Sequence, residues 1–151
     1  MKDTLSNLFS HIKNAQENRI LVIEHIKSRT IIAILNVLQE HGYIRGYRFL
    51  TQKPHKLEIL LKYNANNQKP VINKIIPLSK PSRRVYVRAN QLIKKDSIRL
   101  GYLTKLYGKH GQKQEFLFMQ GILILSTCQG IMDGDTAHKF NLGGQVICQV
   151  Y

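Results

Sequence analysis

Two short polar stretches near the C-terminus carry the residue types that could do chemistry. The first, Ser126-Thr127-Cys128-Gln129-Gly130, offers two hydroxyls, a small thiol, an amide and a flexible glycine directly after an apolar run. Each hydroxyl can both donate and accept a hydrogen bond, and the glycine allows close approach of a backbone. A tip of this kind on a rigid scaffold can enter a groove. On the residue types alone, an ordinary turn at the end of a strand is favoured over a binding site, and contact with the 2′-hydroxyls and distorted bases of RNA is the other interpretation.

The second polar stretch, Gly143-Gly144-Gln145, is the tripeptide that peptidyl-tRNA hydrolysing factors present on an exposed loop at the scissile ester. Here it falls between an expected short helix and the last strand, which favours a turn over a catalytic loop. A hydrolase of this type stays open as the alternative function. Neither a P-loop nor a pair of neighbouring acids for acid/base work is present in the sequence. We therefore expect a binding protein and not an enzyme.

A basic segment supplies the charge for binding. From Ile59 through Lys95 there are nine Lys and Arg residues and no Asp or Glu. Within it, Lys80 and Pro81 belong to a proline-stiffened loop that leads into a strand. Two-residue alternation places Arg84 and Tyr86 on the same side of that strand and turns Arg83 away. An Arg beside an aromatic ring can pair with phosphate and stack on a base, and Arg88 adds to the same segment.

Overall composition agrees with a polyanionic partner. Lys plus Arg number 23 against 9 Asp plus Glu, so the formal net charge is +14 in 151 residues. An anionic membrane is the competing partner, but no apolar run approaches the roughly 20 residues that span a bilayer. The basic residues also do not form the single amphipathic stripe of an interfacial helix. Nucleic acid is therefore the expected partner, with no membrane.

Metals, cofactors and disulfides are not expected. The two cysteines, Cys128 and Cys148, are too few for a disulfide framework and favour a reducing interior. The six histidines are scattered and lack the clustered spacing of zinc ligands.

The N-terminal half is predicted to fold as helix, strand, helix, strand, strand. Asp3 caps a helix that runs to about Glu17, with Leu5, Leu8, Phe9 and Ile12 at helical spacing. A strand follows at 20–23. Ser28 then caps a second helix that Gly42 ends, with its buried face formed by Ile31, Ile34, Leu35 and Leu38. Strands at 43–50 and 57–63 complete this half, and the polar, proline-ended segment 64–70 marks its boundary.

The C-terminal half is predicted to be mostly β with one short helix. The run 121–125 has the length of a strand buried on both faces. Asp133 caps a short helix with Ala137 and Phe140 on one face, and Gly143-Gly144 ends it before a last strand at 145–151. The sequence thus predicts an α+β fold of two small α/β-sandwich-like halves, an N-terminal domain 1–65 and a C-terminal RNA-binding domain 71–151.

These motifs resemble one known family. The pattern Gly121-Ile122, Ser126-Thr127, Gly130-Ile131-Met132 and then Leu142-Gly143-Gly144 is similar to the C-terminal signature of the bacterial and organellar small ribosomal subunit protein 8 family. Looser matches extend from Asp3 to about Lys95. The segment from about 96 to 118 interrupts the pattern as an insertion, for which RNA, a neighbouring protein or no partner at all are equally open.

The resemblance implies a structural constituent of the small ribosomal subunit that binds the central domain of its rRNA and supports assembly and translation. It implies contacts with neighbouring small-subunit proteins, and we expect no homo-oligomer. The resemblance also implies which residues bind rRNA. They are the tip, Ser126 to Gly130, and further residues in three places. Two neighbouring residues lie on the first helix, others in the basic loop and strand, and the rest at the start of the last strand: Lys13, Asn14, Lys80, Pro81, Arg84, Tyr86, Arg88, Gly143, Gly144 and Gln145.

Four residues depart from the family pattern. Gln145 replaces a common Glu, Asp135 replaces a basic residue, Cys128 replaces a frequent Ser, and Ser82 replaces a turn glycine. A serine tolerates positive φ poorly, so the loop around Ser82 is expected to differ. This divergence, the Ile, Lys and Asn richness and a start close to the first helix favour a mitochondrial ribosomal protein. A plastid or bacterial cytoplasmic location is the alternative.

Overall fold

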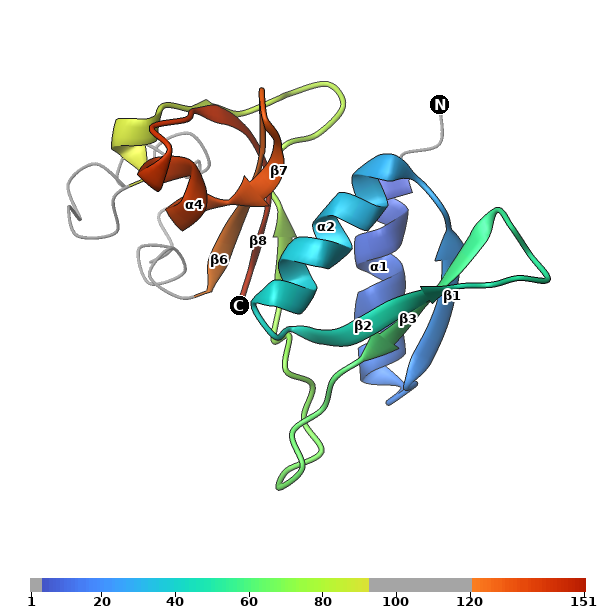
Figure 1. Ribbon diagram of the computed structural model, residues 1–151. Coiled ribbons are helices and arrows are strands. Elements are labelled where there is room, and N and C mark those ends of the chain that lie inside the picture. The colour runs from blue at the N-terminus through green and yellow to red at the C-terminus, as the bar shows by residue number, and fades with distance from the viewer. Residues whose placement is uncertain (1–3, 93–120) are drawn as a thin grey trace.

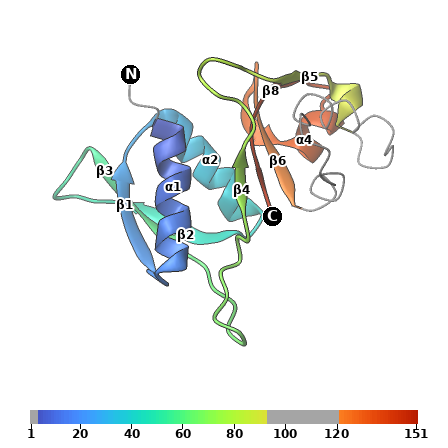
Figure 2. The same cartoon turned by 180° about the vertical axis from the view of Figure 1, so that it is seen from behind.

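The computed structural model describes residues 4–92 and 121–151. Figure 1 shows two helices, α1 and α2, lying between a small antiparallel sheet and a second sheet formed by the C-terminal half. The reverse view in Figure 2 shows the same order of layers. The α+β class is confirmed. Asp3 and the insertion at 96–118 lie outside the described residues.

Helix α1 (Thr4–Glu17) forms because apolar residues recur at helical spacing. Leu8 and Ile12 are fully buried, and Phe9 and Ala15 are nearly so. The second helix, α2 (Arg29–Glu40), buries the four residues that the sequence predicts. Ser28 occupies the N-cap position, but its side chain makes no capping hydrogen bond, so that part of the prediction is wrong. Gly42 follows the helix at a φ of +73°, where glycine is favoured.

The N-terminal sheet contains β1 (Val22–Ile26), β2 (Ile44–Phe49) and β3 (Lys56–Leu61) in the order β1-β3-β2. All pairs are antiparallel. The first strand begins two residues later than expected, because only from Val22 onward do residues alternate between exposure and burial against the helices. Its inward residues, Ile23 and His25, are buried.

The C-terminal sheet is built around β8 (Gly144–Val150). It pairs with β4 (Ile75–Pro77) and β5 (Tyr86–Val87) along one edge and with β6 (Ile122–Thr127) along the other. A further strand, β7 (Gly130–Asp133), pairs with β6. The sequence did not predict β7. The run that precedes the helix is short and mixed, and only pairing across the hairpin makes it a strand.

Two short helical segments complete the C-terminal half of the chain. A 3-10 turn, η1 (Ala89–Gln91), follows β5, and α4 (Gly134–Lys139) follows β7. The Asp133 cap is confirmed, since its Oδ2 accepts a hydrogen bond of 3.1 Å from the Thr136 amide. Ala137 is buried, but Phe140 is 62% exposed, so its predicted inward position is wrong. The helix ends at Lys139, and Asn141 takes a φ of +55° two residues later, before the two glycines are reached.

The hydrophobic core joins the layers. One cluster combines α1, α2 and the N-terminal sheet with Ile124, Ile147, Cys148 and Val150 of the C-terminal sheet. A second cluster lies on the other side of that sheet, under α4 and the β5 segment. Residues 122–125 are half-buried or buried, so the strand buried on both faces is found only at Ile124 and Leu125. The division into domains 1–65 and 71–151 stays a prediction.

Candidate RNA-binding surface

Gln145 lies at the centre of the surface. On one side its Cα partner is Tyr86 of β5, and on the other side its partner is Ser126 of β6. Directly paired residues of antiparallel strands project to the same face of a sheet. Three residues that are 19 to 59 positions apart in sequence therefore form one row across β5, β8 and β6.

The segment leading into β5 adds charge to this row. Residues 84, 86 and 88 are exposed while 85, 87 and 89 are buried, which is the alternation that the sequence predicts. Arg84 Nη1 donates a hydrogen bond of 3.1 Å to Gln145 Oε1. The amide oxygen of Gln145 therefore holds the guanidinium beside Tyr86, a residue that is 66% exposed. A cation next to an open aromatic face suits a phosphate and its neighbouring base.

A tight turn carries Lys80 and Pro81. The Lys80 and Arg83 backbones exchange two hydrogen bonds of 2.9 and 3.0 Å across it. Ser79 fastens the turn to the sheet, since its hydroxyl donates to the Val146 carbonyl and accepts from the Val85 amide. Ser82 does not take a positive φ. A turn that needs no left-handed residue at this position tolerates serine in place of glycine.

The Gly143-Gly144 pair sets the spacing of the surface. A Cβ on Gly144 would lie 2.3 Å from the Ser126 carbonyl oxygen, and one on Gly143 would lie 2.7 Å from the Val87 carbonyl oxygen. Neither residue has a positive φ, so close approach, and not turn conformation, requires glycine here. The prediction that the pair ends the short helix is wrong. The two glycines instead let β8 enter between β5 and β6.

The polar tip is a β-hairpin turn. Ser126 and Thr127 are the last residues of β6, and only Cys128 and Gln129 form the exposed turn. Thr127 Oγ1 donates to the Gly130 carbonyl at 2.9 Å and accepts from the Gln129 amide at 3.2 Å. Gly130 has a φ of +127° and open space around it. The Thr127 hydroxyl therefore holds the turn, while the Ser126 hydroxyl makes no hydrogen bond within residues 4–92 and 121–151.

A cavity of about 430 Å³ lies beside the row, between the two halves. Lys80, Arg84 and Gln145 line it from the C-terminal half, and the first turns of both α1 and α2 line it from the other side. Thr4, Ser6 and Thr30 bring hydroxyls to it. The dipoles of two helix N-termini favour an anion at this place, as the two cations do.

Sequence reasoning missed these three hydroxyl residues, because they become neighbours of Lys80 and Arg84 only when the halves pack together. The residues chosen on α1, Lys13 and Asn14, are exposed but do not line the cavity. At 1.5 Å per residue, Lys13 lies about 13 Å further along the helix than Thr4. A weak ion pair of 3.8 Å joins it to Glu17. A role for Lys13 and Asn14 in RNA binding stays a prediction.

Within the described residues, no three His, Cys, Asp or Glu side chains gather as they would around a metal ion. No helix of the described ranges is long and apolar enough to cross a bilayer. Cys148 is buried in the sheet, and this burial raises the pKa of its thiol. Gln145 sits within β8 with its side-chain oxygen bonded to Arg84, unlike a glutamine displayed on a free loop.

An α+β scaffold that presents cations and hydroxyls around a cavity, with an exposed tyrosine on the adjoining row, has the features of a protein that binds a polyanion. The sequence matches the family described as Ribosomal protein S8 over residues 3–104 and 103–151. The chain belongs to this family. The two matched ranges meet inside the segment where the sequence predicts an insertion.

Bacterial relatives give the same result. The chain is 32% identical to the "Small ribosomal subunit protein uS8" of Aliarcobacter butzleri (strain RM4018) over 153 residues, covering 100% of this chain and 99% of the relative. It is 35% identical to the protein of that name from Chlamydia abortus (strain DSM 27085 / S26/3), covering 99% and 96%. Identity to the Alcanivorax borkumensis (strain ATCC 700651 / DSM 11573 / NCIMB 13689 / SK2) protein is 34%, covering 99% and 98%.

Proposed function

We propose that this chain is a structural constituent of the small ribosomal subunit that binds the central domain of small-subunit rRNA and supports subunit assembly and translation. Membership of the Ribosomal protein S8 family supports the structural, non-enzymatic role. The observation that carries RNA binding is the Tyr86–Gln145–Ser126 row with Arg84 bonded to Gln145. This row places a cation, a ring and a hydroxyl on one face.

The proposed division of labour follows from RNA chemistry. Regular A-form RNA hides its major groove, so a protein gains selectivity from the minor groove, 2′-hydroxyls and distorted bases. The Ser126 hydroxyl and the exposed turn Cys128–Gln129 reach such groups, while Tyr86 stacks on a base or ribose. Lys80 and Arg84, with the helix N-termini across the cavity, hold phosphates and supply affinity without sequence information.

A salt-dependent binding measurement tests the proposal. The purified chain is titrated with a central-domain rRNA fragment and with a regular RNA duplex of equal length. We expect the fragment to bind more tightly and the preference to survive moderate salt, because hydrogen bonds and stacking are not screened as counterion release is. Equal binding to both RNAs, falling together as salt rises, would leave only a basic protein and would refute rRNA recognition.

The exposed thiol of Cys128 gives a position-specific readout. If the hairpin turn enters the RNA, the fragment should slow alkylation of Cys128 by N-ethylmaleimide, and the duplex should not. The buried Cys148 serves as the internal control. Equal alkylation of Cys128 with and without the fragment would place the turn outside the RNA interface.

We further propose that the protein works in a mitochondrial ribosome as a single copy. The divergence from the family pattern and the Ile, Lys and Asn richness support this location, whereas the relatives named above are bacterial. Finding the protein in cytosolic but not organellar ribosomes of the source cell would reverse the location. Sedimentation of the free chain as a dimer would overturn the single copy.

A further inference from the structure

The cavity between the two halves has a lining of two kinds. Its buried part is apolar, since Phe9 of α1 and Ile147 of β8 are each less than a tenth exposed. Leu5, Pro77 and Pro81 extend this part, so five of the twelve lining residues are apolar. The volume of about 430 Å³ lies within the range of about 300–1,000 Å³ that small-molecule sites occupy. A cavity of this size and lining admits the ring of a ligand and not only a small ion.

The exposed part of the lining is cationic and polar. Lys80 and Arg84 are exposed, and so are the hydroxyl residues Thr4 and Thr30, which line the cavity from the first turns of α1 and α2. None of the described residues that line the cavity is acidic. Phosphate oxygens accept hydrogen bonds from guanidinium, ammonium and hydroxyl groups, and the charged donors bind them most strongly. The exposed part therefore suits a phosphate, while the buried part suits an apolar ring.

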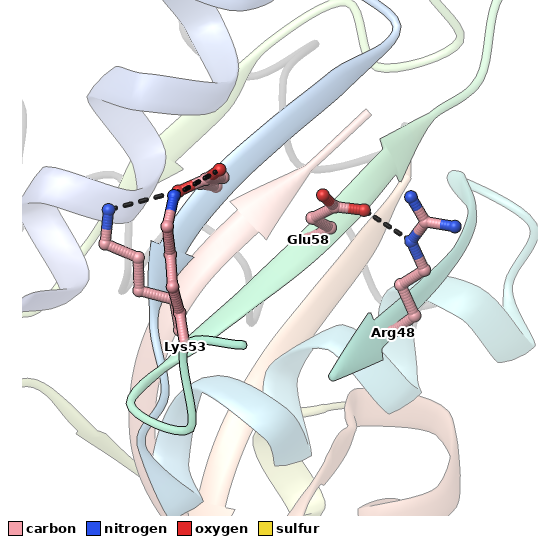
Figure 3. A network of polar contacts seen from close by, with 5 residues as sticks. Arg48, Lys53 and Glu58 are labelled. Atoms are coloured by element: carbon pink, nitrogen blue, oxygen red, sulfur yellow. Dashed lines mark hydrogen bonds and ion pairs between the residues drawn. The ribbon is translucent and has the colours of Figure 1, made fainter. Parts of the chain in front are cut away.

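Carboxylates contact cations elsewhere on the protein but not at this cavity. On the N-terminal sheet, Arg48 is paired with Glu58, and Lys53 also contacts a carboxylate (Figure 3). Within residues 4–92 and 121–151, no carboxylate forms an ion pair with Lys80 or Arg84. A carboxylate beside a cation competes with a phosphate for it. The two cations of the cavity are therefore open to a phosphate ligand.

Hydrogen bonds within the C-terminal half fix the polar groups on that side of the cavity. The Ser79 hydroxyl donates to the Val146 carbonyl and accepts from the Val85 amide, so it is not available to donate to a ligand. Arg84 Nη1 donates to Gln145 Oε1. Because a guanidinium only donates, this bond orients the Gln145 amide and leaves its nitrogen as a donor. Such a donor can bind an acceptor on the edge of a base.

We propose that the cavity binds one nucleotide, with its base or ribose against Phe9 and Ile147 and its phosphate at Lys80 and Arg84. A purely apolar ligand would leave the cations unpaired, and a phosphate ion would leave the apolar lining uncovered. The nucleotide comes either from an unstacked position of the RNA or from a free mononucleotide, since both present a ring and a phosphate. The inference rests on the proposed function, because it assigns a nucleotide site within the proposed RNA-binding surface.

The test titrates the full, isotope-labelled chain with AMP, UMP and inorganic phosphate at one ionic strength and follows the backbone amide signals by NMR. Thr30→Trp fills the cavity from an exposed position of α2 and leaves the charge unchanged. The matched control is Ser10→Trp, which adds the same side chain at an exposed position of α1 that does not line the cavity. Thermal unfolding checks that both variants fold.

We expect the nucleotides to shift the amide signals of Phe9 and Ile147 as well as those of Lys80 and Arg84. Inorganic phosphate should shift only the signals of the two cations. The tighter-binding nucleotide should bind about tenfold more tightly than phosphate, the gain expected from the contacts of one base. Thr30→Trp should abolish the nucleotide shifts at Phe9 and Ile147, and Ser10→Trp should leave them as in wild type.

Two results of this titration would overturn the nucleotide site. Equal affinity for the nucleotides and for phosphate would mean that the ring contributes nothing to binding. Unchanged nucleotide affinity in the Thr30→Trp variant would mean that the nucleotides bind elsewhere on the basic surface.

The rRNA fragment separates the two sources of the nucleotide. If the RNA supplies it, Thr30→Trp should weaken fragment binding about tenfold relative to Ser10→Trp. If a free nucleotide occupies the site, the two variants should bind the fragment equally, and AMP should stay bound in the complex. Loss of the nucleotide site with a normal preference for the fragment over the duplex would overturn this inference alone. Failure of wild type to prefer the fragment would refute the proposed rRNA recognition instead.

Discussion

Adding one methyl group at Gly144 should destabilise the protein and open its RNA-binding row. The added Cβ would lie 2.3 Å from the Ser126 carbonyl oxygen and 3.2 Å from the Thr127 Cα. Ordinary van der Waals contact begins at 3.4 Å, so the β6 backbone would have to move by about 1.1 Å. The obstacle is backbone on a paired strand and not the end of a flexible side chain, so relief means separating β8 from β6.

The structure sets the size of this effect. Gly144 starts β8 opposite Val87, and the next residue, Gln145, pairs with both Tyr86 and Ser126. Overpacking at a site of this kind costs about 1–3 kcal/mol, and each strained strand hydrogen bond adds about 1 kcal/mol. We expect Gly144→Ala to lower the free energy of unfolding by about 3 kcal/mol.

Urea unfolding followed by circular dichroism measures this loss, with the slope m unchanged if only stability changes. The matched control is Gly134→Ala in α4. A Cβ there would meet nothing nearer than the Leu123 Cβ at 3.4 Å, and alanine favours a helix, so stability should stay the same or rise. If Gly144→Ala were as stable as Gly134→Ala and bound rRNA normally, close packing of β8 against β6 would not be what requires glycine at this position.

Three further predictions separate binding from stability. Ser126→Ala should weaken binding to the rRNA fragment about fivefold and leave stability unchanged. Thr127→Ala should lower the free energy of unfolding by about 1 kcal/mol, because the Thr127 hydroxyl holds the hairpin turn. Titration with the fragment and urea unfolding of both variants measure this, and the reverse pattern would contradict these roles. Burial by itself raises the pKa of Asp133, but hydrogen bonding from Thr136 and the nearby His41 outweigh it, so the pKa of the folded protein is lowered from the ordinary 3.8. The stabilisation from ionised Asp133 is therefore complete above that value and is lost as the pH falls below it. Asp133→Asn keeps a capping side chain and should reduce the loss of thermal stability at acid pH. Asp133→Ala should lower the free energy of unfolding by about 1 kcal/mol at pH 7. In native protein one thiol, Cys128, should react rapidly with a thiol reagent, and the buried Cys148 should react only on unfolding; two fast thiols would mean that the centre of β8 opens readily.

Local patterns in the sequence determined much of the fold. Helical spacing of Leu8, Phe9 and Ile12 predicts α1, and that of Ile31, Ile34, Leu35 and Leu38 predicts the buried face of α2. The Asp133 cap and the alternation from Arg84 to Arg88 are equally local, because capping and strand pleating depend on residues only a few positions apart. These features needed no knowledge of the tertiary structure.

Predictions failed where a neighbour distant in sequence decides the outcome. Strand β7 exists because it pairs with β6, and Phe140 is exposed because α4 ends before its face can continue. The sequence does not distinguish the roles of Ser126 and Thr127. In the structure, strand alternation and the hairpin turn place only the Thr127 hydroxyl where it forms hydrogen bonds within the turn.

The sequence by itself determined the polyanionic class of partner, through its charge and its segment free of acids, and identified most residues of the candidate surface. Only the tertiary structure placed Gln145 between Tyr86 and Ser126, brought Thr4, Ser6 and Thr30 to the cavity, and showed that the glycine pair is needed for close approach. The physical reason is that composition and periodicity are properties of the chain. Which strands pair, and what a Cβ would meet between them, depends on packing between segments that are far apart in sequence.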